Sequence, residues 1–204
     1  MNLFFKNYKS IFNYFYKNTN NENIILCGGN TIKKVLFYLS KNFNLKKNRI
    51  LLSDERLVKE NSKFRNDIYY KKLILRNLIS KKKFIFYKKS AIDKLYLDKF
   101  IKTVELNKFQ TCLLSLGVNA HLAGIFNFND KLERSYYYSE SKKKKPKDRV
   151  TISSNKISNC KKIFILVSKK RFKTDLNKFK KINFFKKNKK KIFFLILRNQ
   201  YKNI

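Results

Sequence analysis

Ile24-Ile25-Leu26-Cys27-Gly28-Gly29-Asn30-Thr31 is the stretch of this chain that decides the fold. An apolar run of strand length leads into two glycines, and residues 31–41 then carry apolar side chains at helical spacing. A run without polar residues is typical of a strand that is buried on both faces, as the strands of parallel sheets are. The stretch therefore predicts a buried strand, a tight turn and a helix.

The same alternation recurs along the chain. Helix-length segments at 66–79 and 92–109 separate further apolar runs of strand length, which lie at 50–53, 84–87, 112–116, 163–167 and 192–197. Strands and helices in this order predict an α/β fold, a three-layer αβα and Rossmann-like arrangement with a mainly parallel sheet. We expect a single domain over residues 1–204, because a chain of this length with 43% hydrophobic residues can bury a sizeable core.

Two features favour a cytoplasmic protein. Residues 1–17 mix apolar side chains with Lys and Asn at helical spacing, so they predict an amphipathic helix rather than a signal peptide or membrane span. Cys27, Cys112 and Cys160 are widely separated and lack the short pairing of a zinc site. We expect all three to be reduced thiols in the core.

The chain is strongly basic, with 50 Lys and Arg against 13 Asp and Glu and a formal charge of +37. Such a charge suits nucleic-acid binding. However, only eight of the basic residues are Arg, and the Lys excess accompanies Asn, Ile, Phe and Tyr, whose codons consist mainly of A and T. Lysine-rich residues 142–147 lack aromatic interleaving and predict a solvated loop. We expect no specific nucleic-acid partner and no membrane, although the positive field attracts anionic substrates.

The only histidine, His121, lies just after the apolar run at 112–116. Its position matters because ligands of open α/β sheets bind beyond the carboxyl ends of the strands. Histidine ionises close to neutral pH, so one imidazole can act first as a base and then as an acid. On position alone, a hydrogen-bonded structural histidine is the more common case.

Two other motifs follow predicted strands. Gly28 and Gly29 let backbone amides approach a ligand, and Asn30 or Thr31 can cap a helix whose amino end favours a phosphate. A tight turn needs the two glycines equally. In Asp54-Glu55-Arg56, the acids can hold sugar hydroxyls and the guanidinium can hold an anionic oxygen. The alternative is an ion cluster at a helix start, which contributes only roughly 0 to 1 kcal/mol.

In this order and spacing, the motifs resemble those of the 6-phosphogluconolactonase family, which is related to the glucosamine-6-phosphate isomerases. Residues 27–32 resemble its Ser-Gly-Gly-Ser-Thr-Pro loop, residues 54–58 its Asp-Glu-Arg-x-Val motif, and Asn66 the Asn of a downstream Ser-Asn pair. Residues 114–126 resemble Leu-Gly-x-Gly-x-Asp-Gly-His-x-Ala-Ser-Leu-Phe, with His121 on the histidine. Residues 149–153 resemble a later Arg-Ile-Thr segment. The resemblance covers most of the chain and implies the fold of the sugar-phosphate isomerases and lactonases.

The chain departs from this pattern at several positions. Asn119 stands where the family has Asp, Ala120 replaces a glycine, and Ser115 replaces the first glycine of the loop. An amide at position 119 can still hydrogen-bond but supplies no charge to the imidazole. After the strand at 163–167 the family's Gly-x-x-Lys is blurred, so that Arg171 or Lys173 would take the place of the phosphate-binding lysine.

The resemblance implies hydrolysis of 6-phospho-D-glucono-1,5-lactone to 6-phospho-D-gluconate without a metal or organic cofactor. His121 would be the base and then the acid, and Arg56 would stabilise negative charge on the reacting carboxyl, helped by the amides near Gly28 and Gly29. The substrate would be bound by Gly28, Gly29, Asn30, Thr31, Asp54, Asn66, Asn119, Arg171 and Lys173. The alternatives are a glucosamine-6-phosphate isomerase or deaminase, whose motif has Glu five residues after the histidine where this chain has Phe126, and an impaired relative that binds polyanions.

Overall fold

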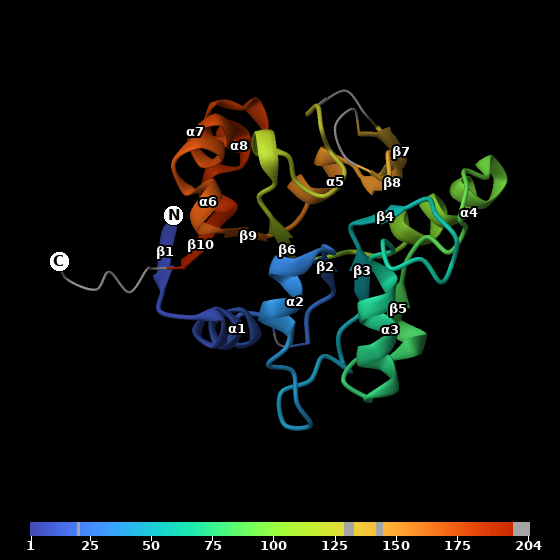
Figure 1. The fold of residues 1–204 in the computed structure, drawn as a ribbon, viewed down its shortest axis with the longest axis horizontal. Helices are drawn as coiled ribbons and strands as arrows, with labels where there is room; N and C mark the ends of the chain where they lie inside the picture. Colours follow the sequence, from blue (N-terminus) through green and yellow to red (C-terminus); the bar gives the residue numbers. More distant parts are fainter. Residues whose placement is uncertain (20, 129–132, 142–144, 198–204) are drawn as a thin grey trace.

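The main sheet of the computed structural model has seven strands in the order β1-β10-β9-β6-β2-β3-β5 (Figure 1). The structure describes residues 1–19, 21–128, 133–141 and 145–197. The strands are β1 (Asn2–Phe5), β2 (Ile24–Leu26), β3 (Ile50–Leu52), β5 (Phe84–Ile85), β6 (Thr111–Ser115), β9 (Lys162–Val167) and β10 (Ile192–Leu197). Every neighbouring pair is parallel. The apolar runs of the sequence therefore form a buried parallel sheet, as predicted.

Helices cover both faces of this sheet. In Figure 1, α1 and α3 lie below the row of strands, whereas α7 and α8 lie above it. The helices are α1 (Tyr8–Lys17), α2 (Asn30–Leu36), α3 (Asp67–Leu75), α4 (Lys94–Glu105), α5 (Ser154–Ser158), α6 (Lys169–Phe172), α7 (Thr174–Lys181) and α8 (Asn183–Asn188), with short 3-10 turns at η1 (Lys81–Lys83), η2 (Val118–Ala120) and η3 (Lys189–Lys191). This arrangement confirms the predicted three-layer α/β fold.

A second, antiparallel sheet lies beside the first and was not predicted. Its order is β4 (Asp54–Arg56), β8 (Asp148–Ile152) and β7 (Tyr136–Glu140). Only Ser53 separates β3 from β4, so the chain passes directly from the main sheet into the small one. The Tyr136 hydroxyl donates to the Leu52 carbonyl and ties the two sheets together. The small sheet therefore carries the Asp-Glu-Arg motif.

The amino-terminal prediction is wrong for its first residues. Residues 2–5 form an edge strand parallel to β10, and the helix begins only at Tyr8. The Met1 amine donates to the Ile192 carbonyl at 2.8 Å, and Asn7 caps α1 by accepting the Ser10 N–H at 2.9 Å. This cap ends the extended segment, because the Asn7 side chain satisfies an N–H that has no partner within the helix.

Other expectations meet mixed outcomes. The three cysteines are buried free thiols, as predicted. The predicted helices at 31–41, 66–79 and 92–109 form but are shorter. The predicted loop at 142–147 lies partly outside the described residues. Among the residues that the structure describes, no helix is long and apolar enough to cross a membrane.

The order of the strands places a crevice between β2 and β6. From β2 the chain proceeds outward through β3 and β5, then returns to β6 on the other side of β2 and continues through β9 to β10. The loops that leave β2 and β6 therefore run in opposite directions. In open α/β sheets, ligands bind beyond the carboxyl ends of the strands at such a switch point.

Candidate active site

A cavity of about 160 Å³ lies at this switch point. It is lined by Cys27, Gly28, Gly29, Asp54, Arg56, Asn66, Ser115, Gly117, His121, Ala123 and Arg149. The fold thus brings together the predicted residues of the first turn, the Asp-Glu-Arg motif and the histidine loop. The remaining predicted residues, Asn30, Thr31, Asn119, Arg171 and Lys173, are not among those that line it.

His121 has a defined orientation. Its Nδ1 lies 2.6 Å from the Val118 carbonyl oxygen. A carbonyl only accepts hydrogen bonds, so Nδ1 donates, and in the neutral ring the lone pair resides on Nε2. A backbone carbonyl therefore occupies the orienting position that the resemblance implies for an acid at residue 119. The exposed Asn119 instead uses its backbone N–H, which donates to Asp175.

The loop that carries His121 is tight and strained. The Gly117 N–H donates to the His121 carbonyl at 2.9 Å, and a Cβ at Gly117 would lie 2.0 Å from the ring's Cε1. Asn119, Ala120 and Ala123 have φ of 60°, 63° and 52°, a region that non-glycine residues rarely adopt. Strain of this kind persists only where the surroundings impose it.

The first turn and the Asp-Glu-Arg motif meet through Asn66. The Asn66 amide donates to the Asp54 carbonyl oxygen at 3.0 Å and to its carboxylate at 3.1 Å. A Cβ on Gly28 would lie 2.0 Å from Asn66 Cγ, so the contact requires glycine there. Gly29, at φ 92°, is the N-cap residue of α2. Asn30 and Thr31 already lie within the helix, so the prediction that one of them caps it is wrong.

Glu55 is a buried residue to which the sequence assigned no separate role. Its carboxylate accepts the backbone N–H groups of Arg56, Asn66 and Asp67 at 2.7, 2.7 and 2.8 Å. Burial raises the pKa of Glu55 to about 7, although the Asn66 N–H and the Arg65 guanidinium oppose this shift. Glu55 therefore ties β4 to the start of α3 and positions two residues that line the cavity.

Arg149 is a site residue that the sequence reasoning missed. It lies on β8, with Nη1 3.8 Å from Asp54 Oδ2 and the guanidinium carbon 5.5 Å from the centre of the Phe126 ring. The Phe126 ring also lies 5.1 Å from the imidazole of His121. Burial lowers the pKa of Arg149, and the Asp54 carboxylate opposes the shift. The signal that could have found it is the Arg-Val-Thr segment at 149–151.

The two arginines that line the cavity share one property. The Nε atoms of Arg56 and Arg149 are buried and have no hydrogen-bond partner among the residues that the structure describes. A buried N–H without an acceptor is unfavourable, so an anionic oxygen that pairs with it gains binding free energy. The cavity thus combines an imidazole with two guanidinium groups. Cys27 adds no nucleophile, because burial raises the pKa of its thiol.

The two predicted phosphate ligands lie elsewhere. Arg171 belongs to α6, where its Nη1 pairs with Asp175 at 3.2 Å. Lys173 lies between α6 and α7 and is exposed. The structure therefore does not bring these two residues to the cavity.

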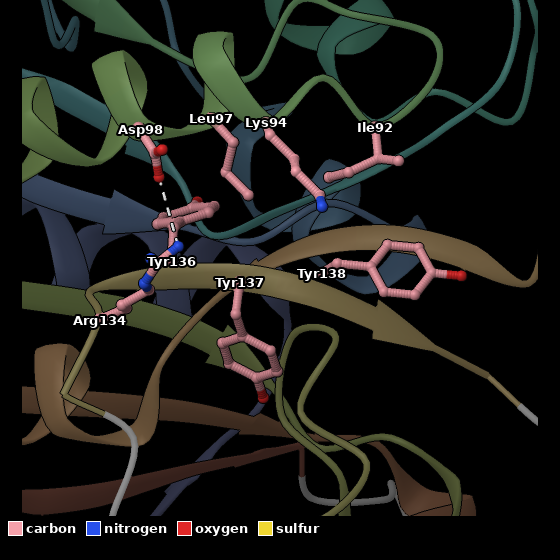
Figure 2. Close-up of a pocket in the computed structure, with 8 residues that line it drawn as sticks. All are labelled: Ile92, Lys94, Leu97, Asp98, Arg134, Tyr136, Tyr137 and Tyr138. Carbon is pink, nitrogen blue, oxygen red and sulfur yellow. Dashed lines mark hydrogen bonds and ion pairs between the residues drawn. The ribbon is translucent and has the colours of Figure 1, made fainter.

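Two larger hollows contain none of the predicted residues. One, of about 410 Å³, lies between α4 and β7 and includes the Asp98–Arg134 ion pair at 3.3 Å (Figure 2). The other, of about 730 Å³, lies near the amino ends of β6 and β9. Within the described ranges, no three His, Cys, Asp or Glu residues are grouped as a metal ion would require.

Three comparisons place the chain among known proteins. A relative from Borreliella burgdorferi named 6-phosphogluconolactonase is 28% identical over 172 residues, 76% of this chain and 72% of the relative. The structure of 6-phosphogluconolactonase from Thermotoga maritima matches with a TM-score of 0.82 at 17% identity, covering 97% of this chain and 98% of that one. A monomeric glucosamine-6-phosphate deaminase matches with a TM-score of 0.79 at 14% identity, covering 97% of each chain.

Because structures of both kinds match, the fold alone does not separate a lactonase from a deaminase. The family is nevertheless defined. Residues 6–183 match the model described as glucosamine-6-phosphate isomerases/6-phosphogluconolactonase. This match covers most of the chain, which therefore belongs to the glucosamine-6-phosphate isomerase/6-phosphogluconolactonase family.

Proposed function

We propose that this protein hydrolyses 6-phospho-D-glucono-1,5-lactone to 6-phospho-D-gluconate, in the oxidative branch of the pentose phosphate pathway. The observation that carries the proposal is the contact between Nδ1 of His121 and the Val118 carbonyl, in a cavity that two arginines also line. Because a carbonyl only accepts hydrogen bonds, Nδ1 donates, and Nε2 of the neutral ring carries the lone pair that acts as the base. The relative from Borreliella burgdorferi, which is named for this activity, supports the choice of substrate.

The reaction needs one proton acceptor and one site for negative charge. Nε2 of His121 takes a proton from water while the water oxygen attacks the lactone carbonyl carbon. The carbonyl oxygen becomes negatively charged, and Arg56 stabilises it with its guanidinium. The bond between that carbon and the ring oxygen then breaks, and the imidazolium gives its proton to the ring oxygen. The product is a carboxylic acid and a free hydroxyl; the acid then releases its proton to solvent and becomes a carboxylate. These steps use no metal or organic cofactor.

Binding of the substrate relies on positive charge and on backbone donors. Arg149 pairs with an anionic oxygen of the substrate, and the amides near Gly28 and Gly29, which also line the cavity, add further donors. Asp54 and Asn66 position hydroxyls or support the arginines. The formal charge of +37 raises the local concentration of a sugar phosphate. The three buried thiols fit a reaction in the cytoplasm.

Phe126 argues against isomerisation or deamination. Those reactions, in the related enzymes, call for a glutamate at this position, five residues after the histidine. Here a phenyl ring lies close to both the imidazole and the Arg149 guanidinium. It holds no group that transfers a proton. A role in polyanion binding rests on the charge alone, and no contact at the cavity favours it.

The test generates the lactone in place with glucose-6-phosphate dehydrogenase and follows its disappearance. His121→Gln and His121→Ala should both reduce the loss to the spontaneous rate while circular dichroism shows a folded protein. Asp98→Asn is the matched control, because this carboxylate lies in an exposed ion pair on α4 (Figure 2), and it should keep wild-type turnover. If folded wild-type protein does not accelerate the loss, the lactonase proposal fails and polyanion binding becomes the stronger alternative.

A further inference from the structure

A buried carboxylate outside the cavity contacts the loop that carries His121. Asp175 lies in the first turn of α7 and is 4% exposed. Its Oδ1 accepts the backbone N–H of Asn119 at 2.8 Å, and its Oδ2 pairs with Arg171 Nη1 at 3.2 Å. Burying a carboxylate is unfavourable unless hydrogen bonds and a counter-charge compensate for it. Both oxygens have such a partner here.

The N–H that Asp175 accepts belongs to the same peptide group as the carbonyl that orients the imidazole. The peptide between residues 118 and 119 carries the Val118 oxygen on one side and the Asn119 N–H on the other. A peptide group is planar, so a partner that holds the N–H also fixes the direction of the C=O. Hydrogen bonds in series also polarise one another, so the carboxylate makes this carbonyl a stronger acceptor.

The peptide needs such a partner because its neighbourhood is strained. Asn119 and Ala120 have φ of 60° and 63°, two consecutive non-glycine residues in the left-handed region. Strain of this kind persists only where contacts with the surroundings impose it. Helix α7 supplies such a contact.

We propose that Asp175 is the positioning acid of His121 and acts through the peptide between residues 118 and 119, with Arg171 holding the carboxylate in place. The series runs from the Arg171 guanidinium to Asp175, to the peptide, and to Nδ1 of the imidazole. The Asp175 carboxylate thus places a negative charge beside the loop, where position 119 itself carries only an amide. The effect on turnover rests on the proposed function, whereas the effect on the tautomer does not.

The first measurement is steady-state kinetics of Asp175→Asn, which keeps the size of the side chain and removes its charge. We expect kcat to fall about 10-fold to 100-fold, as a lost hydrogen bond to a charged group implies, with KM within about threefold of wild type. If Arg171 only binds the phosphate of the substrate, Arg171→Gln should instead raise KM and leave kcat unchanged. Asp98→Asn, on the exposed surface of α4, should change neither constant.

The second measurement is nitrogen NMR of the imidazole, which is unambiguous because the chain has a single histidine. In neutral wild-type protein the ring should be protonated at Nδ1. In Asp175→Asn the tautomer with the proton on Nε2 should become populated. This readout needs no substrate, so it is independent of the proposed function. If Asp175→Asn shifts the tautomer but the wild-type protein has no lactonase activity, the proposed function is rejected and this inference stands.

Wild-type kcat and an unchanged tautomer in folded Asp175→Asn would overturn the inference. If that variant does not fold, Arg171→Gln decides the question, because it keeps the Asp175 carboxylate but removes the guanidinium that holds it toward the Asn119 N–H. It should lower kcat about 2-fold to 10-fold and shift the tautomer in the same direction. An unchanged kcat and tautomer in Arg171→Gln would then reject the proposal.

Discussion

Replacing Gly117 by alanine tests the position of His121 by steric means alone. Gly117 has φ −92° and ψ −180°, an extended conformation that alanine adopts without strain. A Cβ there would lie 2.0 Å from Cε1 and 2.3 Å from Nε2 of the imidazole. Ordinary contact begins at 3.4 Å, so the ring has to retreat by about 1.4 Å and lose its 2.6 Å contact with the Val118 carbonyl.

A displacement of this size should reduce kcat for the lactone about 100-fold, since a misplacement of about 1 Å has that cost for a reacting group. The assay is the coupled loss of lactone, with the melting temperature as a check on folding. Overpacking by an added methyl group destabilises a protein by about 1 to 3 kcal/mol, so the variant should have a lower melting temperature but remain folded.

Gly124→Ala is the matched control for this prediction. Gly124 lies in the same loop as His121, but its added Cβ would lie 2.9 Å from Thr151 Cβ and so contact a different side chain. It should lower the melting temperature by a similar amount and keep kcat within about threefold of wild type. Folded Gly117→Ala with wild-type kcat would refute the placement of the imidazole as the base.

Three further changes test the surroundings of the base. Gly28→Ala should lower kcat/KM about tenfold in the lactone assay, because its Cβ would lie 2.0 Å from Asn66 Cγ and displace that amide. Unchanged kinetics would show that Asn66 has no role in binding or turnover. Arg149→Lys should raise KM about tenfold, since an ammonium keeps the charge but loses the planar fork that lies over Phe126; a KM equal to wild type would contradict this role. Burial raises the pKa of Glu55 from 4.5 to about 7, so the folded state keeps a proton that the unfolded state releases, and the free energy of unfolding should fall by about 3 kcal/mol as pH rises through this range. Urea unfolding of Glu55→Gln should lack this fall, and an identical pH dependence in both proteins would refute it.

The main sheet was predictable because its strands are apolar on both faces. Runs such as 24–27 and 163–167 carry no polar residue and are buried in the structure. The small sheet was not predictable in the same way. Strand β7, Tyr136–Glu140, has one buried residue, Tyr136, and otherwise half-buried and exposed ones, and the three residues of β4 are all charged. Short strands of this kind depend on their partner strands, which lie far away in the sequence.

The residues of the candidate site likewise include some that the sequence could predict and some that it could not. His121, Gly28 and Arg56 were predictable because each follows a buried strand, and parallel strands present their carboxyl ends at one edge. Arg149 received no role, although residues 149–153 carry part of the family resemblance, because it reaches the cavity from an antiparallel strand whose register the sequence does not show. The partner of Nδ1 was invisible for another reason: it is a backbone carbonyl, and every residue has one.

A backbone carbonyl and a carboxylate do different things for an imidazole. The Val118 carbonyl selects which nitrogen of the neutral ring carries the proton, so it defines the base before the reaction starts. The ring becomes positively charged only when it takes the proton from water, and a neutral carbonyl stabilises that charge less than an acid does. With an amide at position 119, the charge has to come from elsewhere in the loop's surroundings. Asp175 is a buried carboxylate bonded to that loop, one peptide group away from Nδ1. If His121 acts as the proposed base, the Asp175 carboxylate on α7 is therefore placed to compensate for the amide at residue 119.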